Sequence, residues 1–280
     1  MSEKYIGIDI GGTSARVGEF DGLDLDTVRK REDFQISNEY PEDMERLAAT
    51  IRKLTEGDSP AGVGLGIAGE FNEDRSRLVQ SPNAQGWVDR PLREDLAAEL
   101  GCRVVLINDA EAGAWAEAGF GGHDQDFWFI TWGTGVGGGI VEQCSGGPHV
   151  IAAEPGHHVI RWDETSPQCN CGKRGCIEAY VGGAKIAERF GKPAAELSDK
   201  EWEDVTDWFA RGLYSVIRTR PVNLVVMGGG VASKQARHLP EIERKLNEYL
   251  GGLRAVKVSG ATHGEDAGMV GALAALRAEG

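Results

Sequence analysis

The sequence predicts an α/β protein made of two related domains, and three observations support this fold class. The chain has 280 residues, which is long for one domain and comfortable for two. Segments with the apolar pattern of buried strands alternate with segments of helical periodicity. A strand, a glycine-threonine turn and a return strand occur as DIGGTSARVG near the start and again as WGTGVGGGIV, which indicates an internal duplication.

The first cycle of elements begins with strands and ends with helices. The expected strands are short apolar runs bounded by turn residues such as the Asp21-Gly22 pair, and they lie at residues 5–10, 15–20, 27–34, 63–68 and 103–107. The expected helices have start signals such as Pro41 followed by acids, and they lie at residues 41–56, 91–100 and 110–118.

A second cycle follows and is interrupted by an irregular segment at residues 154–178. Its expected strands lie at residues 127–132, 138–142, 224–227 and 255–258. Its expected helices lie at residues 177–190, 201–218, 239–250 and 265–277.

Composition restricts the partners. The formal net charge of −14 repels nucleic acid phosphates, so we expect no nucleic acid partner. The apolar run of the N-terminal MSEKYIGIDI is too short for a signal peptide, and no stretch approaches the roughly 20 apolar residues of a membrane span. We therefore expect a cytoplasmic protein with no membrane partner, whose five cysteines are reduced.

The two glycine-threonine turns are candidates for phosphate binding. Glycine lets backbone N–H groups approach an anion without a Cβ in the way, and Thr13 and Thr134 add hydroxyl donors. Either turn alone would favour an ordinary β-hairpin, whereas two matched turns favour a phosphate clamp. The pattern GxGxxG also occurs at Gly133 and at Gly64, but no clear amphipathic helix follows either match, which argues against a dinucleotide fold.

A cysteine cluster gives the strongest chemical signal. Cys169, Cys171 and Cys176 fall within eight residues, and His157 and His158 precede them by about a dozen. Three thiolates and one histidine suit a closed tetrahedral zinc site, which would be structural rather than catalytic. The alternatives are free thiols or a strained Cys169–Cys171 disulfide.

Asn108 and Asp109 lie where a strand gives way to a helix. Asp or Asn at that place is commonly a helix N-cap. The functional alternative is a general base at the carboxyl edge of a sheet, where α/β proteins bind ligands.

Taken together, these motifs resemble the ROK family, which groups bacterial sugar kinases with sugar-responsive repressors. The matching segments follow the family order along nearly the whole chain: Asp9 to Thr13, Ser81-Pro82-Asn83 with Gly86-Trp87, Asn108-Asp109-Ala110, Gly133 to Gly139, Glu154 to His157, CxCGxxGCxE from Cys169 to Glu178, and Gly228 to Val231. The ExGH and CxCGxxGCxE pair is highly specific to this family. Departures at Ser14, Trp132 and Pro155 concern substrate preference more than chemistry.

The resemblance implies a two-domain actin-like ATPase (ribonuclease H-like) fold with an interdomain active-site cleft. The domains would be residues 1–108 plus 265–280, and residues 109–264 with the zinc loop. It implies Asp109 as the catalytic base and His157 as the fourth zinc ligand. The implied sugar ligands are Gly69, Asn83, Asn108, Glu154, His157 and Glu178. The implied MgATP-binding residues are Asp9, Gly11, Gly12, Thr13, Arg16, Thr134, Gly135, Gly229 and Gly230.

The expected function is an ATP-dependent hexose kinase, which would phosphorylate glucose to glucose 6-phosphate. N-acetylmannosamine, N-acetylglucosamine, fructose and mannose are alternative acceptors, and a homodimer is a possible assembly. A sugar-responsive regulator is less expected, because such proteins need a DNA-binding domain before the first turn, which here begins within ten residues of the start. A non-catalytic zinc-stabilised sugar-binding protein is a more distant alternative.

Overall fold

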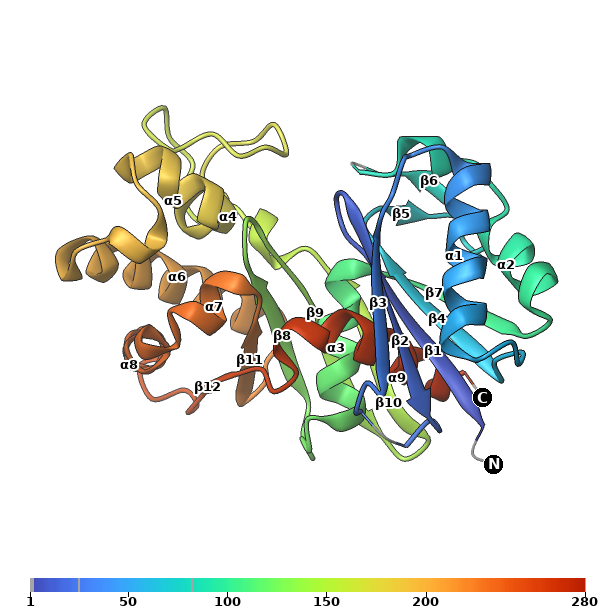
Figure 1. The fold of residues 1–280 in the computed structure, drawn as a ribbon. Helices are drawn as coiled ribbons and strands as arrows, with labels where there is room; N and C mark the ends of the chain where they lie inside the picture. Colours follow the sequence, from blue (N-terminus) through green and yellow to red (C-terminus); the bar gives the residue numbers. More distant parts are fainter. Residues whose placement is uncertain (1–2, 25, 82, 280) are drawn as a thin grey trace. The chain divides into compact units, whose positions relative to one another are not determined.

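The computed structural model describes residues 3–24, 26–81 and 83–279, and these form two compact units (Figure 1). The first unit comprises residues 1–122 and 265–280, and the second comprises residues 123–264. The first boundary differs from the expected one at residue 108. Residues 109–122 lie in the first unit because their helix packs Ala112 and Ala116 against the C-terminal helix, in clusters with Met269 and Ala272.

The first unit contains a five-stranded sheet in the order β3-β2-β1-β4-β7. The strands are β1 (Lys4–Ile10), β2 (Ser14–Asp21), β3 (Lys30–Gln35), β4 (Gly62–Ile67) and β7 (Arg103–Asn108). β1 is antiparallel to β2, and β2 is antiparallel to β3, whereas β1, β4 and β7 run parallel. A separate two-stranded hairpin is formed by β5 (Glu70–Phe71) and β6 (Leu78–Gln80).

Helices cover both faces of this sheet (Figure 1). They are α1 (Tyr40–Leu54), α2 (Leu92–Leu100), α3 (Asp109–Phe120) and α9 (Ala267–Ala278). The sequence GVGLGI of β4 sends its branched side chains to the α1 and α2 face, where they join Leu47 and Leu96 in one core. Its glycines face α9, and a Cβ on Gly64 would lie 2.0 Å from the carbonyl oxygen of Ala272. Alternation in the strand therefore lets the alanine-rich α9 lie directly on the sheet.

The second unit repeats the same topology with the strand order β10-β9-β8-β11-β12. The strands are β8 (Phe127–Trp132), β9 (Val136–Cys144), β10 (Gly147–Ala153), β11 (Leu224–Gly228) and β12 (Lys257–Gly260). The helices are α4 (Ile177–Val181), α5 (Gly183–Phe190), α6 (Asp199–Thr219), α7 (Gly230–Lys234) and α8 (Leu239–Leu250). Trp132 of β8 packs edge-on against Phe209 of α6, with ring centroids 4.6 Å apart, in the main core of the unit.

One local prediction needs correction, and the strands β5, β6 and β10 and the helix α7 were not expected. The helix expected at residues 177–190 is broken at Gly182, because the Gly183 N–H donates to the carbonyl oxygen of Gly133 (2.9 Å) rather than continuing α4. Strand β10 was not expected, and Pro148 marks it as an edge strand. The short helix α7 was also missed, as its five residues carry no measurable periodicity. The α/β fold with a duplicated strand-turn-strand unit is confirmed.

No helix in the described part of the chain is both long and apolar enough to cross a membrane.

Candidate functional site

The first glycine turn links β1 to β2 and presents Thr13 to solvent. The Gly11 N–H donates to the carbonyl oxygen of Ser14 (2.9 Å), which closes the turn. At the end of β1, Asp9 pairs in register with Arg16 and lies 3.5 Å from its guanidinium. Burial raises the pKa of the Asp9 carboxyl, the Arg16 charge opposes this shift, and the charge of Asp109 adds to it. Asp9 and Asp109 are therefore electrostatic neighbours within the first unit.

Asn108, not Asp109, caps helix α3. Its Oδ1 accepts the Ala110 N–H (2.8 Å), and its Nδ2 donates to the Gly69 carbonyl oxygen (2.6 Å). Asp109 is the first helical residue, its Oδ1 accepts the same Ala110 N–H (2.9 Å), and its side chain reaches solvent. Desolvation by the surrounding protein raises the pKa of Asp109. The N-cap interpretation thus belongs to Asn108, which leaves Asp109 available for another role.

In the same unit, Gly69 lies beside Asn108, and Asn83 lies beside the first glycine turn. Gly69 has a φ of +153°, and a Cβ there would lie 2.4 Å from the carbonyl oxygen of Gln80, so the hairpin approaches it closely. The side chain of Asn83 lies against the first glycine turn, since a Cβ on Gly12 would be 3.5 Å from its Nδ2. Pro82 of the same motif lies outside the described residues.

The second glycine turn, at residues 133–135, is anchored from two sides. The Gly133 and Thr134 carbonyl oxygens accept the N–H groups of Gly183 (2.9 Å) and Ala184 (3.0 Å) at the start of α5. Gly229 has a φ of +90° and approaches the backbone of Trp132, where a Cβ would lie 2.6 Å from the carbonyl oxygen. The Gly228 to Gly230 segment and the second turn are therefore adjacent, as the motif order suggested.

Glu178 connects the second turn to the cysteine cluster. Its Oε2 accepts the Val136 N–H (2.9 Å), and its Oε1 lies 3.6 Å from Sγ of Cys169. A Cβ on Gly135 would lie 2.4 Å from Oε2, so a larger residue at this point of the turn would have to displace the Glu178 carboxylate. Nothing in the sequence motif signals this bridge, because Glu178 and Val136 are 42 positions apart.

Glu154 and His157 share one short turn beside β9. The His157 N–H donates to the Glu154 carbonyl oxygen (3.0 Å). A Cβ on Gly156 would lie 1.9 Å from the carbonyl oxygen of Val136, which explains the glycine of the ExGH motif. The metal-ligand candidate His157 and the candidate Glu154 are thus held against the strand that follows the second turn.

His157, Cys169, Cys171 and Cys176 place their four donor atoms within 4.8 Å of one another. Cys171 Sγ lies 3.7 Å from Cys176 Sγ, and Cys169 Sγ lies 3.6 Å from His157 Nδ1. A tetrahedral zinc with bonds of about 2.3 Å to sulfur and about 2.0–2.1 Å to nitrogen separates its donors by about 3.5–3.8 Å. The donor set therefore fits zinc in its chemistry, and these two donor pairs have the spacing that zinc imposes.

The cysteines are free thiols, which excludes the alternative disulfide. Burial raises the pKa of Cys169, and it raises the pKa of Cys176 to about 12. A coordinated cation deprotonates such thiols outright. Gly175, with a φ of +74° and a Cβ position 1.5 Å from the Arg161 carbonyl oxygen, allows the tight loop that gathers them.

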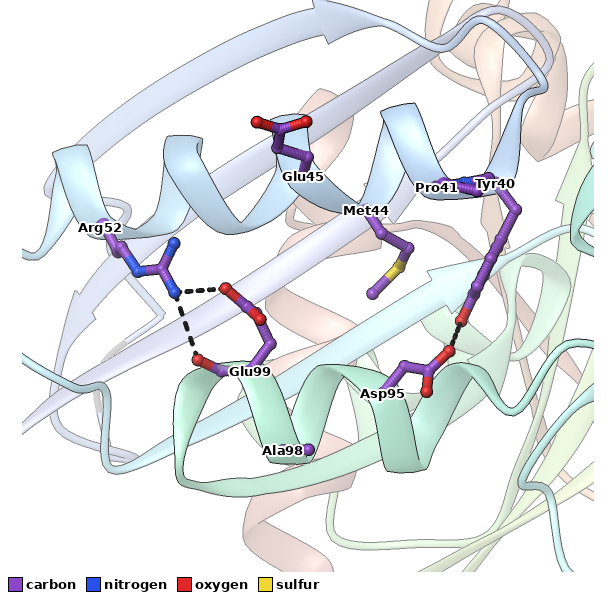
Figure 2. Close-up of a pocket in the computed structure, with 8 residues that line it drawn as sticks. All are labelled: Tyr40, Pro41, Met44, Glu45, Arg52, Asp95, Ala98 and Glu99. Carbon is purple, nitrogen blue, oxygen red and sulfur yellow. Dashed lines mark hydrogen bonds and ion pairs between the residues drawn. The ribbon is translucent and has the colours of Figure 1, made fainter.

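A separate groove on the first unit is lined by none of these residues. It runs between α1 and α2, as Figure 2 shows, where Tyr40 donates a hydrogen bond to Asp95 (2.8 Å) and Arg52 pairs with Glu99. Its volume is about 620 Å³, and its lining includes none of the candidate site residues. The polar pairs across it hold the two helices together.

Comparison with known proteins shows which family this chain is similar to. The profile described as the ROK family matches residues 5–279. A protein from Thermotoga maritima named glucokinase is 31% identical, with 98% of this chain and 97% of the relative covered. A protein from Salmonella gallinarum named N-acetyl-D-glucosamine kinase is 29% identical, with coverage of 96% and 97%.

Solved structures give the same result for the fold. The ROK hexokinase from Thermus thermophilus has a TM-score of 0.81 and 27% identity, with 97% of each chain covered. A ROK family glucokinase from Streptomyces griseus, solved with glucose and AMPPNP, has a TM-score of 0.72 and 26% identity, with coverage of 96% and 98%. The predicted actin-like ATPase fold is thereby confirmed, and this chain belongs to the ROK family.

Proposed function

We propose that this protein is an ATP-dependent hexose kinase, which transfers the γ-phosphoryl group of MgATP to a hydroxyl of glucose and forms glucose 6-phosphate. The observation that carries the proposal is Asp109, a solvent-reaching carboxylate at the end of β7 whose helix is already capped by Asn108. Membership of the ROK family and a relative named glucokinase support the substrate class.

Asp109 acts as the general base. A sugar hydroxyl is a poor nucleophile and must lose its proton as the phosphoryl group arrives. The raised pKa of Asp109 brings its basicity closer to neutral pH, which favours proton transfer.

The ATP-binding residues position the nucleotide and neutralise its charge. The two glycine turns would bind the phosphates through backbone N–H groups and through the exposed hydroxyls of Thr13 and Thr134. Asp9 would meet the hydrated Mg²⁺, with Arg16 holding its carboxylate at 3.5 Å. Gly229 and Gly230, beside the second turn, would receive the adenosine.

The sugar-binding residues are amides and carboxylates, which pair well with adjacent hydroxyls. In the first unit these are Gly69, Asn83 and Asn108. The Asn108 amide has one N–H left after its bond to Gly69. In the second unit they are Glu154, His157 and Glu178.

The proposed zinc is structural, since all four positions of its tetrahedron are filled by protein side chains. Zinc would hold the loop of residues 157–176 in place. It would thereby hold Glu178, which contacts both Cys169 and Val136.

A coupled assay of ADP release against a panel of hexoses tests this function. We expect sugar-dependent ADP release with glucose as the preferred acceptor. A specific observation favours N-acetylglucosamine as the second candidate, because a relative that is 29% identical is named N-acetyl-D-glucosamine kinase. Sugar binding without any release of ADP would leave a non-catalytic sugar-binding protein as the better account. Cytoplasmic location and a homodimer stay predictions.

A further inference from the structure

Asp43 is a fully buried carboxylate that binds two loops of the first unit. Its exposed fraction is 0%, and it lies in the first turn of α1. Its Oδ1 accepts the backbone N–H (2.7 Å) and the hydroxyl (3.0 Å) of Ser37. Its Oδ2 accepts the Asn38 N–H (2.9 Å) and the Trp87 Nε1–H (3.2 Å). Four donors satisfy the two oxygens of an ionised carboxylate, which compensates the cost of burying it.

The two loops also contact each other directly. The Gly86 N–H donates to Oδ1 of Asn38 (3.1 Å), and a Cβ on Gly86 would lie 1.8 Å from the Asn38 carbonyl oxygen. Asn38 has a φ of +69°, a left-handed conformation that asparagine tolerates better than most residues. Tyr40, which also lines the groove of Figure 2, packs edge-on against Trp87 with ring centroids 5.7 Å apart.

The contacts of Asp43 continue to the first glycine turn in both directions. On one side, the Ile36 N–H, next to Ser37, donates to the Thr13 carbonyl oxygen (3.1 Å). On the other side, Trp87 ends the short segment 83–87, whose Asn83 side chain lies against Gly12. These contacts form a closed ring that begins and ends at residues 12 and 13, and Asp43 is the residue that joins its two halves.

We propose that Asp43 is a positioning residue that fixes Asn83 relative to the first glycine turn. This role rests on the proposed function, in which Asn83 binds the sugar and the turn binds the nucleotide phosphates. Transfer between bound groups is sensitive to misplacement, since a shift of about 1 Å can cost on the order of 100-fold in rate. The Trp87 arm of the ring acts on Asn83, and the Ser37 and Asn38 arm acts on the glycine turn.

The test compares two tryptophan substitutions. Trp87→Phe keeps a buried aromatic ring and removes one hydrogen bond to Asp43. Trp202→Phe, in the second unit, is the matched control, because Trp202 is 1% exposed and its Nε1–H has no hydrogen-bond partner among the described residues. We expect Trp87→Phe to raise the KM for sugar about tenfold, which is the effect of losing one hydrogen bond to a charged group. The KM for ATP should stay within twofold of wild type. Trp202→Phe should change neither KM.

Hydrogen–deuterium exchange provides a readout independent of catalysis. Trp87→Phe should speed amide exchange in residues 84–87 but not in α6, and Asp43→Asn should speed it in residues 36–38 as well. Unchanged exchange in residues 84–87, or an equal rise in sugar KM from Trp202→Phe, would overturn the proposal. If the wild-type protein phosphorylates no sugar, the proposed function fails, while the exchange data still decide whether Asp43 positions the segment.

Discussion

Asp109→Asn separates the proposed catalytic role from helix capping, because Asn108 is the residue that caps α3. The Asn108 cap on Ala110 (2.8 Å) stays intact in this variant, and the new amide keeps an oxygen for the same N–H. We therefore expect the free energy of unfolding to stay within about 0.5 kcal/mol of wild type. Loss of a general base should lower kcat by about 10²–10⁴-fold, which is roughly 2.7–5.5 kcal/mol in the barrier.

Asn108→Ala is the matched variant with the opposite expectation for stability. It removes the cap, worth about 0.5–2 kcal/mol, and the hydrogen bond to the Gly69 carbonyl oxygen, worth about 0.5–1.5 kcal/mol. Urea unfolding followed by circular dichroism measures stability, and a coupled assay at saturating substrate measures kcat. A folded Asp109→Asn protein with near wild-type turnover would refute the role of Asp109 as the base.

Three further predictions concern the metal, the pH dependence and the second turn. Cys171→Ser should lower both zinc content and melting temperature, because metal binding is coupled to folding. Cys144→Ser, at an exposed cysteine outside the cluster, should change neither. Full zinc content in Cys171→Ser would contradict the ligand set. Because burial raises the pKa of Asp109, kcat/KM should fall with acid at a pH above the ordinary aspartate pKa of about 3.9. The same shift affects stability. Asp109 contributes stability that is present below the ordinary pKa of the unfolded chain and is lost as the pH rises through the raised pKa of the folded protein. If the same fall of kcat/KM with acid persists in Asp109→Asn, the titrating group is a residue other than Asp109. Gly135→Ala should destabilise the protein by about 1–3 kcal/mol and raise the KM for ATP, because the new Cβ would lie 2.4 Å from Oε2 of Glu178. Gly146→Ala is the control: its new Cβ meets no atom within 4 Å, so stability and the KM for ATP should stay unchanged.

Local patterns predicted most of the fold. Apolar runs and caps located β1, α1, β7 and α8 to within a few residues, and the repeated turn indicated the duplication that the two sheets share. The division of the two units after residue 122, rather than after residue 108, could not be predicted this way. It depends on how the small residues of α3 fit those of α9, which are more than 140 positions away in the chain.

The candidate site was predictable where chemistry is confined to a short motif. Spacing alone indicated the cysteine cluster, and the four donor atoms do converge. Which of Asn108 and Asp109 caps α3 was not predictable from the residue types, because either type can cap a helix. The contacts of Asp43 and Glu178 were also missed, since each joins segments that are about 40 residues apart and no periodicity signals such a contact.

Phosphorus NMR of wild-type protein with MgATP and glucose tests the central claim most directly. The account predicts that the γ-phosphoryl signal of ATP declines as a sugar phosphate ester signal grows, one for one, and that neither changes without sugar. Asp109→Asn should show both signals almost unchanged over the same time. Loss of ATP to inorganic phosphate at one rate with and without glucose would contradict a sugar kinase.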